Sequence, residues 1–92
     1  MSSKITIPEE AKQKYLERRW QDLESCRKAL SARDFECFST VGHQIKGNAV
    51  TFGFDELAPI AIDMENFGLS KDVKKLEEVL NLFEAYLNRI KN

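Results

Sequence analysis

The most chemically suggestive part of this sequence is a helical stretch around its single histidine, His43. Side chains three and four positions apart share one face of a helix, so Lys46 and Gly47 lie beside His43 on that face. A neutral imidazole is a good nucleophile near physiological pH and accepts a phosphoryl group. The ammonium of Lys46 would neutralise charge on the transferred group. The spacing therefore predicts phosphoryl-transfer chemistry at His43.

The apolar residues of the same stretch predict which way the histidine points. At helical periodicity they form a stripe on the far side of the helix: Phe38, Val41, Ile45, Ala49 and Phe52. Burial of that stripe would turn the imidazole of His43 toward solvent, together with Val50. Gly47 leaves bare backbone one turn further on, although a helix interior prefers alanine by roughly 1 kcal/mol. This pattern predicts a surface that a docking partner approaches closely.

The rest of the chain must supply the helices that hold this face in place. Helical periodicity runs through almost the whole sequence, and no stretch shows the two-residue alternation of a strand. This periodicity predicts an all-α fold. The short connections between helices favour an antiparallel up-down-up-down four-helix bundle. Capping and stop residues place the four helices at Thr6 or Pro8 to about Leu30, Asp34 to about Gly53, Asp55 to Gly68, and Ser70 to about Ile90.

Each of the other helices carries an apolar face of its own. The expected core positions are Leu16, Trp20, Leu23, the aliphatic stem of Arg27 and Leu30 in the first helix, Leu57, Ile60, Ala61, Met64 and Phe67 in the third, and Val73, Leu76, Leu80, Phe83, Leu87 and Ile90 in the fourth. Pro59 leaves two interpretations of the third helix open. Either this helix begins later than Asp55, or one carbonyl near Asp55 loses its helical hydrogen bond.

Composition and charge exclude several classes of function. With 92 residues, 42% of them hydrophobic and 32% charged, the chain is expected to form one globular domain over 1–92. The 14 basic and 15 acidic residues are dispersed, which argues against nucleic acid as a partner. The sequence has no apolar run of membrane-spanning length and no signal-peptide pattern, so we expect a cytoplasmic protein without a membrane partner.

The two cysteines, Cys26 and Cys37, are too few for a zinc site, and no metal is expected to bind the chain itself. If their helices form a hairpin that turns near Ala32, the two thiols lie at similar heights. Their heights would then allow a contact between them. A reducing compartment favours free thiols over a disulfide.

Glu65 is a candidate third member of the histidine site. With a turn near Phe54, His43 and Glu65 are equally far from the turn and occupy similar heights on neighbouring helices. A carboxylate that accepts a hydrogen bond from one ring nitrogen would fix the tautomer of His43 and favour attack by the other nitrogen. A surface Glu65 that touches nothing agrees equally well with this geometry.

The chain also lacks the parts that a kinase needs. It has no Gly-rich phosphate loop, no carboxylate cluster for magnesium and too little length for a nucleotide-binding fold. No cofactor is therefore expected in this chain. The metal ion and the second reacting group would come from a docked partner.

The residues around His43 resemble the signature of the histidine phosphotransfer (HPt) domain. The match is His43-x-Ile45-Lys46-Gly47-x-Ala49-x-x-Phe52-Gly53-Phe54, followed by Leu57, Ala61 and Met64-Glu65. The stretch is also similar to the N-terminal phosphoacceptor domain of chemotaxis histidine kinases, including Met64-Glu65-Asn66. In some of those relatives a second polar residue stands where this chain has Ile62.

The resemblance implies a four-helix bundle in which His43 takes a phosphoryl group from a receiver-domain aspartyl phosphate and passes it to another receiver aspartate. It implies that Lys46 assists, that Gly47 permits close approach and that Glu65 hydrogen-bonds the imidazole. The implied partners are response-regulator receiver domains, which supply Mg²⁺, and a hybrid or chemotaxis-type histidine kinase.

The surface beside the histidine is expected to contact these partners through Gln44, Gly47, Val50 and Phe54. Phe54 also suits a second role, in which it closes the end of the bundle. His43 is followed by Gln44 rather than by the acidic residue and nearby proline of dimerising kinase helices. This difference favours a monomer.

The sequence therefore indicates three candidate functions. The leading one is a phosphorelay intermediate in two-component signalling. The first alternative is the phosphoacceptor substrate domain of a chemotaxis-type histidine kinase. The second alternative is a receiver-binding helical module without chemistry.

Overall fold

A computed structural model describes residues 7–90 as four α-helices. Their bounds are α1 (Glu9–Ala32), α2 (Phe35–Asn48), α3 (Leu57–Ser70) and α4 (Val73–Ile90). No strand occurs within residues 7–90, so the expected all-α fold is confirmed. Thr6 lies outside the described residues, and Pro8 occupies the N-cap position of α1 without a side-chain cap.

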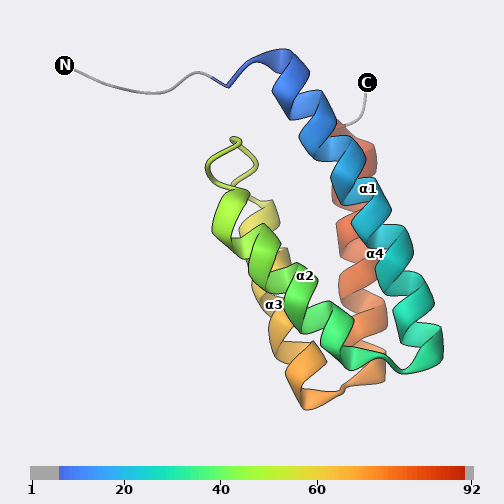
Figure 1. Ribbon diagram of the computed structural model, residues 1–92. Helices are drawn as coiled ribbons and strands as arrows, with labels where there is room; N and C mark the ends of the chain where they lie inside the picture. Colours follow the sequence, from blue (N-terminus) through green and yellow to red (C-terminus); the bar gives the residue numbers. More distant parts are fainter. Residues whose placement is uncertain (1–6, 91–92) are drawn as a thin grey trace.

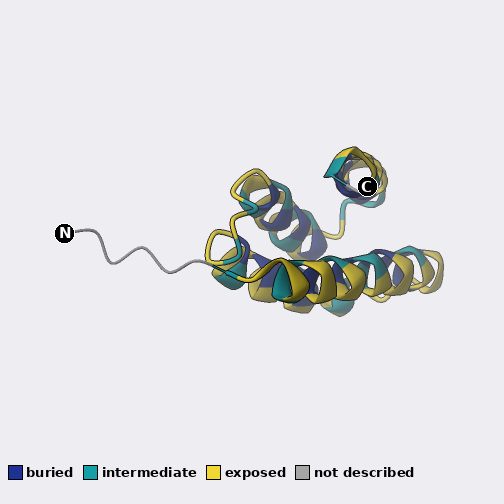
Figure 2. Ribbon diagram, turned by 90° about the horizontal axis from the view of Figure 1, so that it is seen from above, coloured by how far each residue is buried: buried dark blue, intermediate teal, exposed yellow. Residues whose placement is uncertain are grey.

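The helices form a bundle in which each one packs against two others. The packed pairs are α1 with α2, α2 with α3, α3 with α4, and α4 with α1. In Figure 1 the chain descends along α1, returns along α2, descends along α3 and returns along α4, consistent with the expected antiparallel order. Figure 2, seen from above, shows exposed positions on the outer sides of the helices and buried positions between them. The bundle thus holds α2 and α3 side by side.

The centre of the bundle is built from large apolar side chains of all four helices. Burial of each such side chain contributes roughly 1.5–3 kcal/mol to folding. The largest fully buried side chains are Phe38, Phe83, Ile45, Leu57, Met64, Leu76, Leu80, Leu87 and Cys26. On α2 the predicted stripe is confirmed for Phe38, Val41, Ile45 and Ala49.

On α1 the predicted core positions Leu23 and Leu30 are confirmed, but the buried face of its first half differs from the prediction by about one residue. Tyr15 and Arg19 are buried there, whereas Leu16 and Trp20 are only partly buried. The guanidinium of Arg19 lies 4.4 Å from the ring centroid of Tyr15, and its Nε donates a hydrogen bond of 2.7 Å to Asp22. Because these polar groups find partners inside the bundle, their long side chains are buried in place of purely apolar ones.

α2 ends at Asn48, five residues before the Gly53 stop that its sequence indicates. The Tyr15 hydroxyl donates a 2.6 Å hydrogen bond to the Asn48 side chain. Phe52 and Phe54 both stack on the Tyr15 ring, with centroid separations of 4.4 and 5.5 Å. These contacts favour turns over 49–56 in place of another helical turn, and they leave Phe52 only partly buried. Gly53, at φ +88°, takes a backbone conformation that glycine adopts without strain.

The structure settles how Pro59 is accommodated in α3. The helix begins at Leu57, later than an Asp55 cap would place it, so Pro59 lies in the first turn, where a helical N–H has no intrahelical acceptor. The expected Asp55 cap is wrong, because Glu56 holds the N-cap position and makes no side-chain cap. Asp34 does precede α2, but its side chain makes no capping hydrogen bond either.

Two further boundaries near α4 were predicted wrongly. α3 continues through Gly68 and ends at Ser70, and its C-cap Lys71 has a left-handed backbone at φ 56°. Gly68 is buried against α2 and does not stop the helix. The residue that caps α4 is Asp72, not Ser70, since an Asp72 side-chain oxygen accepts a 3.1 Å hydrogen bond from the Lys75 amide.

Candidate functional site

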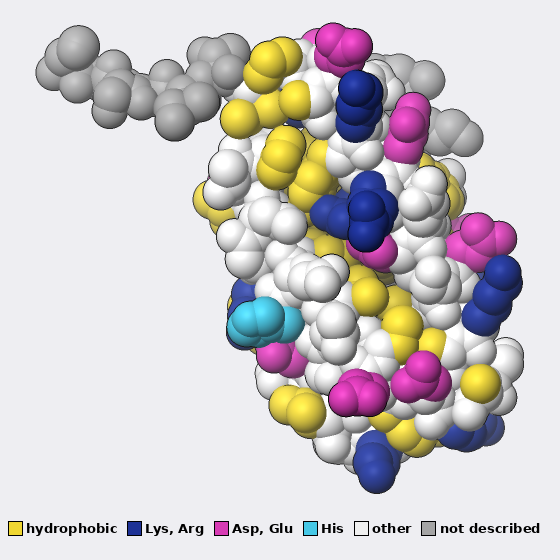
Figure 3. Space-filling view, viewed as in Figure 1, with side chains coloured by type: hydrophobic (Ala, Val, Ile, Leu, Met, Phe, Trp, Pro, Cys, Tyr) yellow, Lys and Arg dark blue, Asp and Glu magenta, His cyan; other side chains and the backbone are white. Residues whose placement is uncertain are grey.

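His43 stands on the outer surface of α2. Its side chain is 70% exposed, and Figure 3 shows the imidazole protruding at the edge of the molecule. The stripe on the opposite side of α2 is buried in the core, so the predicted outward orientation of the histidine is confirmed. An incoming group can therefore reach the ring without any opening of the bundle.

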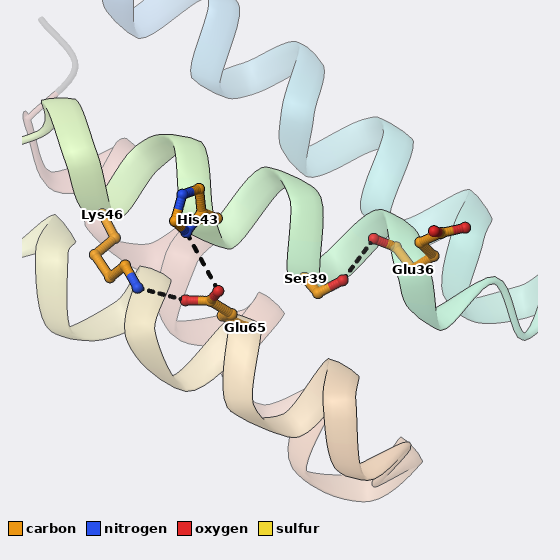
Figure 4. Close-up of polar contacts among 5 residues, drawn as sticks. All are labelled: Glu36, Ser39, His43, Lys46 and Glu65. Carbon is orange, nitrogen blue, oxygen red and sulfur yellow. Dashed lines mark hydrogen bonds and ion pairs between the residues drawn. The ribbon is translucent and has the colours of Figure 1, made fainter.

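Glu65 reaches across from α3 to both His43 and Lys46 (Figure 4). One carboxylate oxygen accepts a 2.8 Å hydrogen bond from the Lys46 ammonium. The other lies 3.4 Å from Nδ1 of His43, which makes an ion pair when the ring is protonated. Of the two geometric alternatives left open by the sequence, the structure thus shows the one in which Glu65 lies at the ring. Because Nδ1 faces the carboxylate, Nε2 is the ring nitrogen left for an incoming group.

The charge of Glu65 is stabilised by these neighbours. The hydrogen bond from Lys46 is the main cause that holds the pKa of the Glu65 carboxyl below its ordinary value of 4.5. Partial burial opposes this effect, and the positive charge of Lys46 and the nearby His43 support it. The carboxylate is therefore ionised at neutral pH and available to both partners.

The four predicted contact residues near His43, Lys46 and Glu65 differ in how far they are exposed. Gln44 and Gly47 are exposed on α2, and no atom lies within 4 Å of a Cβ placed on Gly47. Val50 follows the end of α2 and is 59% exposed. Phe54 is half-buried and stacks on Tyr15, as in its alternative role at the end of the bundle. The open backbone at Gly47 and the exposed Val50 leave room beside the imidazole.

Sequence reasoning missed two features that shape the site. Gly42 and Gly68 are buried at points where α2 and α3 pack too closely for a Cβ atom. The signal in the sequence is a glycine inside each helix. Gly42 gave rise to no prediction, and Gly68 was predicted to stop its helix. The hydrogen bond between Tyr15 and Asn48 also went unforeseen, because no periodicity relates residues of different helices.

The described residues also bear on metal binding, on membrane crossing and on the state of the two cysteines. Within residues 7–90 no group of three His, Cys, Asp or Glu side chains gathers as a metal site would require. Across the same residues, no helix combines the length and apolarity needed to cross a membrane. Cys26 and Cys37 are free thiols that interact across the contact of α1 and α2, as their predicted heights indicated, and burial raises the pKa of both.

The fold is a four-helix bundle that presents an exposed histidine beside a lysine and a glutamate. A family model described as the Hpt domain matches residues 10–92. The chain therefore belongs to the Hpt domain family, and it functions in phosphotransfer in two-component signalling. Proteins of this family work with receiver domains and histidine kinases. No curated protein and no solved structure gives a significant match to the chain.

The contact between Lys46 and Glu65 predicts a pH-dependent contribution to stability. Because the folded pKa of Glu65 lies below its unfolded value, this contribution is complete above the unfolded pKa and is lost as the pH falls through the folded pKa. Lys46→Ala is expected to raise the Glu65 pKa toward its ordinary value. NMR titration of the side-chain carboxyl checks the pKa directly.

Urea unfolding supplies the second measurement for the same variant. The stability difference between the wild type and Lys46→Ala should be present at neutral pH and vanish in strong acid. An equal difference at both pH values would mean that Lys46 acts through packing of its stem and not through the charge of Glu65.

Proposed function

We propose that this protein is a phosphorelay intermediate whose phosphoacceptor is His43. In this proposal, a receiver domain with an aspartyl phosphate docks beside the exposed imidazole, and the phosphoryl group moves to Nε2. A second receiver domain then removes it to its own aspartate. The observation that carries the proposal is a His43 side chain that is 70% exposed beside the open backbone of Gly47, where a receiver domain has room to dock.

The transfer step uses the three side chains in distinct ways. Nε2 attacks the phosphorus atom, the bond from phosphorus to the aspartate oxygen breaks, and the aspartate leaves as a free carboxylate. The ring keeps its Nδ1 proton and gains positive charge, which the Glu65 carboxylate offsets. Lys46 stands one helical turn from His43, close enough for its ammonium to neutralise charge on the phosphoryl oxygens.

The partner must supply what this chain does not contribute. We expect the receiver domain to bring the Mg²⁺ ion as well as the second reacting group, because no carboxylate cluster within residues 7–90 suits a metal. Gln44, Gly47 and Val50 are the proposed contact residues, with Phe54 at the margin of this surface. We also propose that the protein acts as a monomer, and that it works in the cytoplasm, where free thiols such as those of Cys26 and Cys37 persist.

Label transfer tests the proposal. The purified protein is mixed with a receiver domain carrying a radioactive aspartyl phosphate and Mg²⁺, and the label on each protein is followed with time. A phosphohistidine is labile in acid and stable in base, whereas an aspartyl phosphate is labile in base. Label on this chain with the first pattern supports the proposal, and the absence of any label from every receiver tested contradicts it.

A chemotaxis-type kinase substrate domain is the second candidate function. The observation that favours it is the position of Glu65 at His43, since the similar phosphoacceptor domains place a glutamate at this point. Here the phosphoryl group would come from ATP through a separate catalytic domain. Labelling by such a kinase but by no receiver would favour this candidate over the relay. Binding to receivers without labelling from either source would instead favour a receiver-binding module without chemistry.

Lys46→Ala is expected to slow transfer between a receiver and this protein by about tenfold to a hundredfold. The reason is the loss of a cation one helical turn from the reacting nitrogen. The melting temperature should fall only by the small amount that loss of the exposed ion pair with Glu65 explains, because the side chain lies off the buried face of α2. Rates from quenched time courses, together with thermal unfolding, check both parts, and an unchanged rate would remove Lys46 from the mechanism.

A further inference from the structure

Gly42 lies immediately before the histidine, on the buried side of α2. A Cβ atom at this position would lie 2.7 Å from the carbonyl oxygen of Ala61 and 2.8 Å from the amide nitrogen of Glu65. Both atoms belong to the backbone of α3, so no change of a side-chain rotamer would relieve the contact. The missing side chain of Gly42 therefore allows α3 to approach α2 as closely as it does.

This close approach concerns Glu65 directly. The third atom near a Cβ on Gly42 is the Cβ of Glu65, at 3.1 Å. Gly42 thus lies against the backbone nitrogen and the Cβ of Glu65, where that side chain begins. From there the carboxylate reaches Lys46 at 2.8 Å and His43 at 3.4 Å (Figure 4). The contact with His43 is already longer than a standard hydrogen bond, so a small retreat of α3 would break it.

The other helical glycines show that this arrangement is specific to Gly42. Gly47 is also in α2, but a Cβ there would meet no atom within 4 Å. Gly68 of α3 is packed as tightly as Gly42, with a Cβ position 2.8 Å from the Cβ of Phe38. The Gly68 contact lies at a different point of the helix pair, and the three atoms nearest to its Cβ position belong to Phe35, Phe38 and Ser39 rather than to Glu65. Gly68 is therefore a matched control for tight packing alone.

We propose that Gly42 is a positioning residue of the phosphotransfer site, because its missing side chain sets the separation of α2 and α3 at which Glu65 reaches His43 and Lys46. Its effect on transfer rests on the proposed function, whereas its effect on the imidazole is independent of that function. In Gly42→Ala the new Cβ must move from 2.7 Å to more than 3.0 Å from the Ala61 oxygen, toward the 3.4 Å of ordinary packing. A shift of this size carries the Glu65 carboxylate out of reach of Nδ1.

The first experiment reads the imidazole in the free protein. His43 is the single histidine of the chain, so its two ring nitrogens give unambiguous ¹⁵N NMR signals. In the wild type we expect Glu65 to favour the tautomer that carries the proton on Nδ1. Glu65→Gln and Gly42→Ala should both shift the ring toward the Nε2–H tautomer, whereas Gly47→Ala and Gly68→Ala should leave it closer to the wild type.

The second experiment measures transfer from a labelled receiver in a double-mutant cycle. Gly42→Ala is expected to slow transfer by roughly tenfold to a hundredfold, since small displacements of reacting groups have effects of this size. In a Glu65→Gln background the same substitution should have little further effect on the rate. Its effect on unfolding should be the same in both backgrounds. A residue with a merely structural role would not produce this difference.

Several results would overturn the inference. One is a wild-type imidazole spectrum in a folded Gly42→Ala protein, and another is an equal tautomer shift in Gly68→Ala. If Gly42→Ala does not fold, Glu65→Asp replaces it, because this change withdraws the carboxylate by one methylene while Gly42 stays in place. A wild-type spectrum for Glu65→Asp would then show that the helix separation is not critical. If no receiver labels any variant, the proposed function fails, and the NMR result still decides the role of Gly42.

Discussion

His43→Gln is expected to reduce phosphoryl transfer by at least about a thousandfold, as the loss of a reacting nucleophile does in other group-transfer sites. Glutamine keeps a polar side chain of moderate size but offers no nitrogen that forms a phosphoryl bond. The measurement is the label retained on this chain after incubation with a phosphorylated receiver and Mg²⁺.

The same variant should unfold as the wild type does. The side chain of His43 is 70% exposed, and substitutions at such positions change stability by only about 0.5 kcal/mol. Gln21→Ala, at an exposed position of α1, serves as a control with normal labelling. Full labelling of His43→Gln would place the phosphoryl group on another residue and refute the proposed site.

Of the substitutions proposed here, Phe38→Ala is expected to cause the largest loss of stability, about 3–5 kcal/mol. The Phe38 ring is completely buried in the core of the bundle, so its removal loses apolar burial and leaves a cavity. The Cβ that packs on Gly68 remains in the variant, and the contact of α2 with α3 is retained there. Because a domain has only about 5–15 kcal/mol of stability in total, urea or thermal unfolding should detect the change easily.

Phe52→Ala is the matched comparison on the same predicted stripe. Phe52 is partly buried and stacks on Tyr15, so its removal exposes less apolar surface and leaves no closed cavity. We expect a clearly smaller loss of stability than for Phe38→Ala. Equal losses would show that the turns over 49–56 are as strongly coupled to folding as the core.

Local patterns in the sequence predicted the helices and the outward histidine. The helical spacing of apolar residues in α2 predicted its buried side, and the position of His43 on the other side followed from helical geometry alone. The contact with Glu65 was one of two open alternatives, because it depends on the rotation of α3 about its own axis. No pattern within a single helix determines that rotation.

The errors at two glycines came from contacts between distant residues. Gly53 and Gly68 were both read as helix stops, since glycine ends helices more often than it packs inside them. In the structure Gly68 faces Phe38, and α2 ends early because Tyr15 on another helix binds Asn48. The buried Arg19 was missed for a different reason. Its partners Tyr15 and Asp22 lie on the same helix, but a search for apolar periodicity does not consider a charged side chain whose neighbours satisfy it.

The aromatic contacts of Tyr15 bear on the smallest unit that could carry the reaction. A peptide of residues 35–70 would contain the imidazole, the ammonium and the carboxylate, yet it would lack the α1 ring on which Phe52 and Phe54 stack. Its connecting turn and its apolar faces would be open to water, and isolated helices of this length are marginal in solution. In such a peptide the imidazole, the ammonium and the carboxylate would therefore not stay close to one another. All four helices are needed to hold them together.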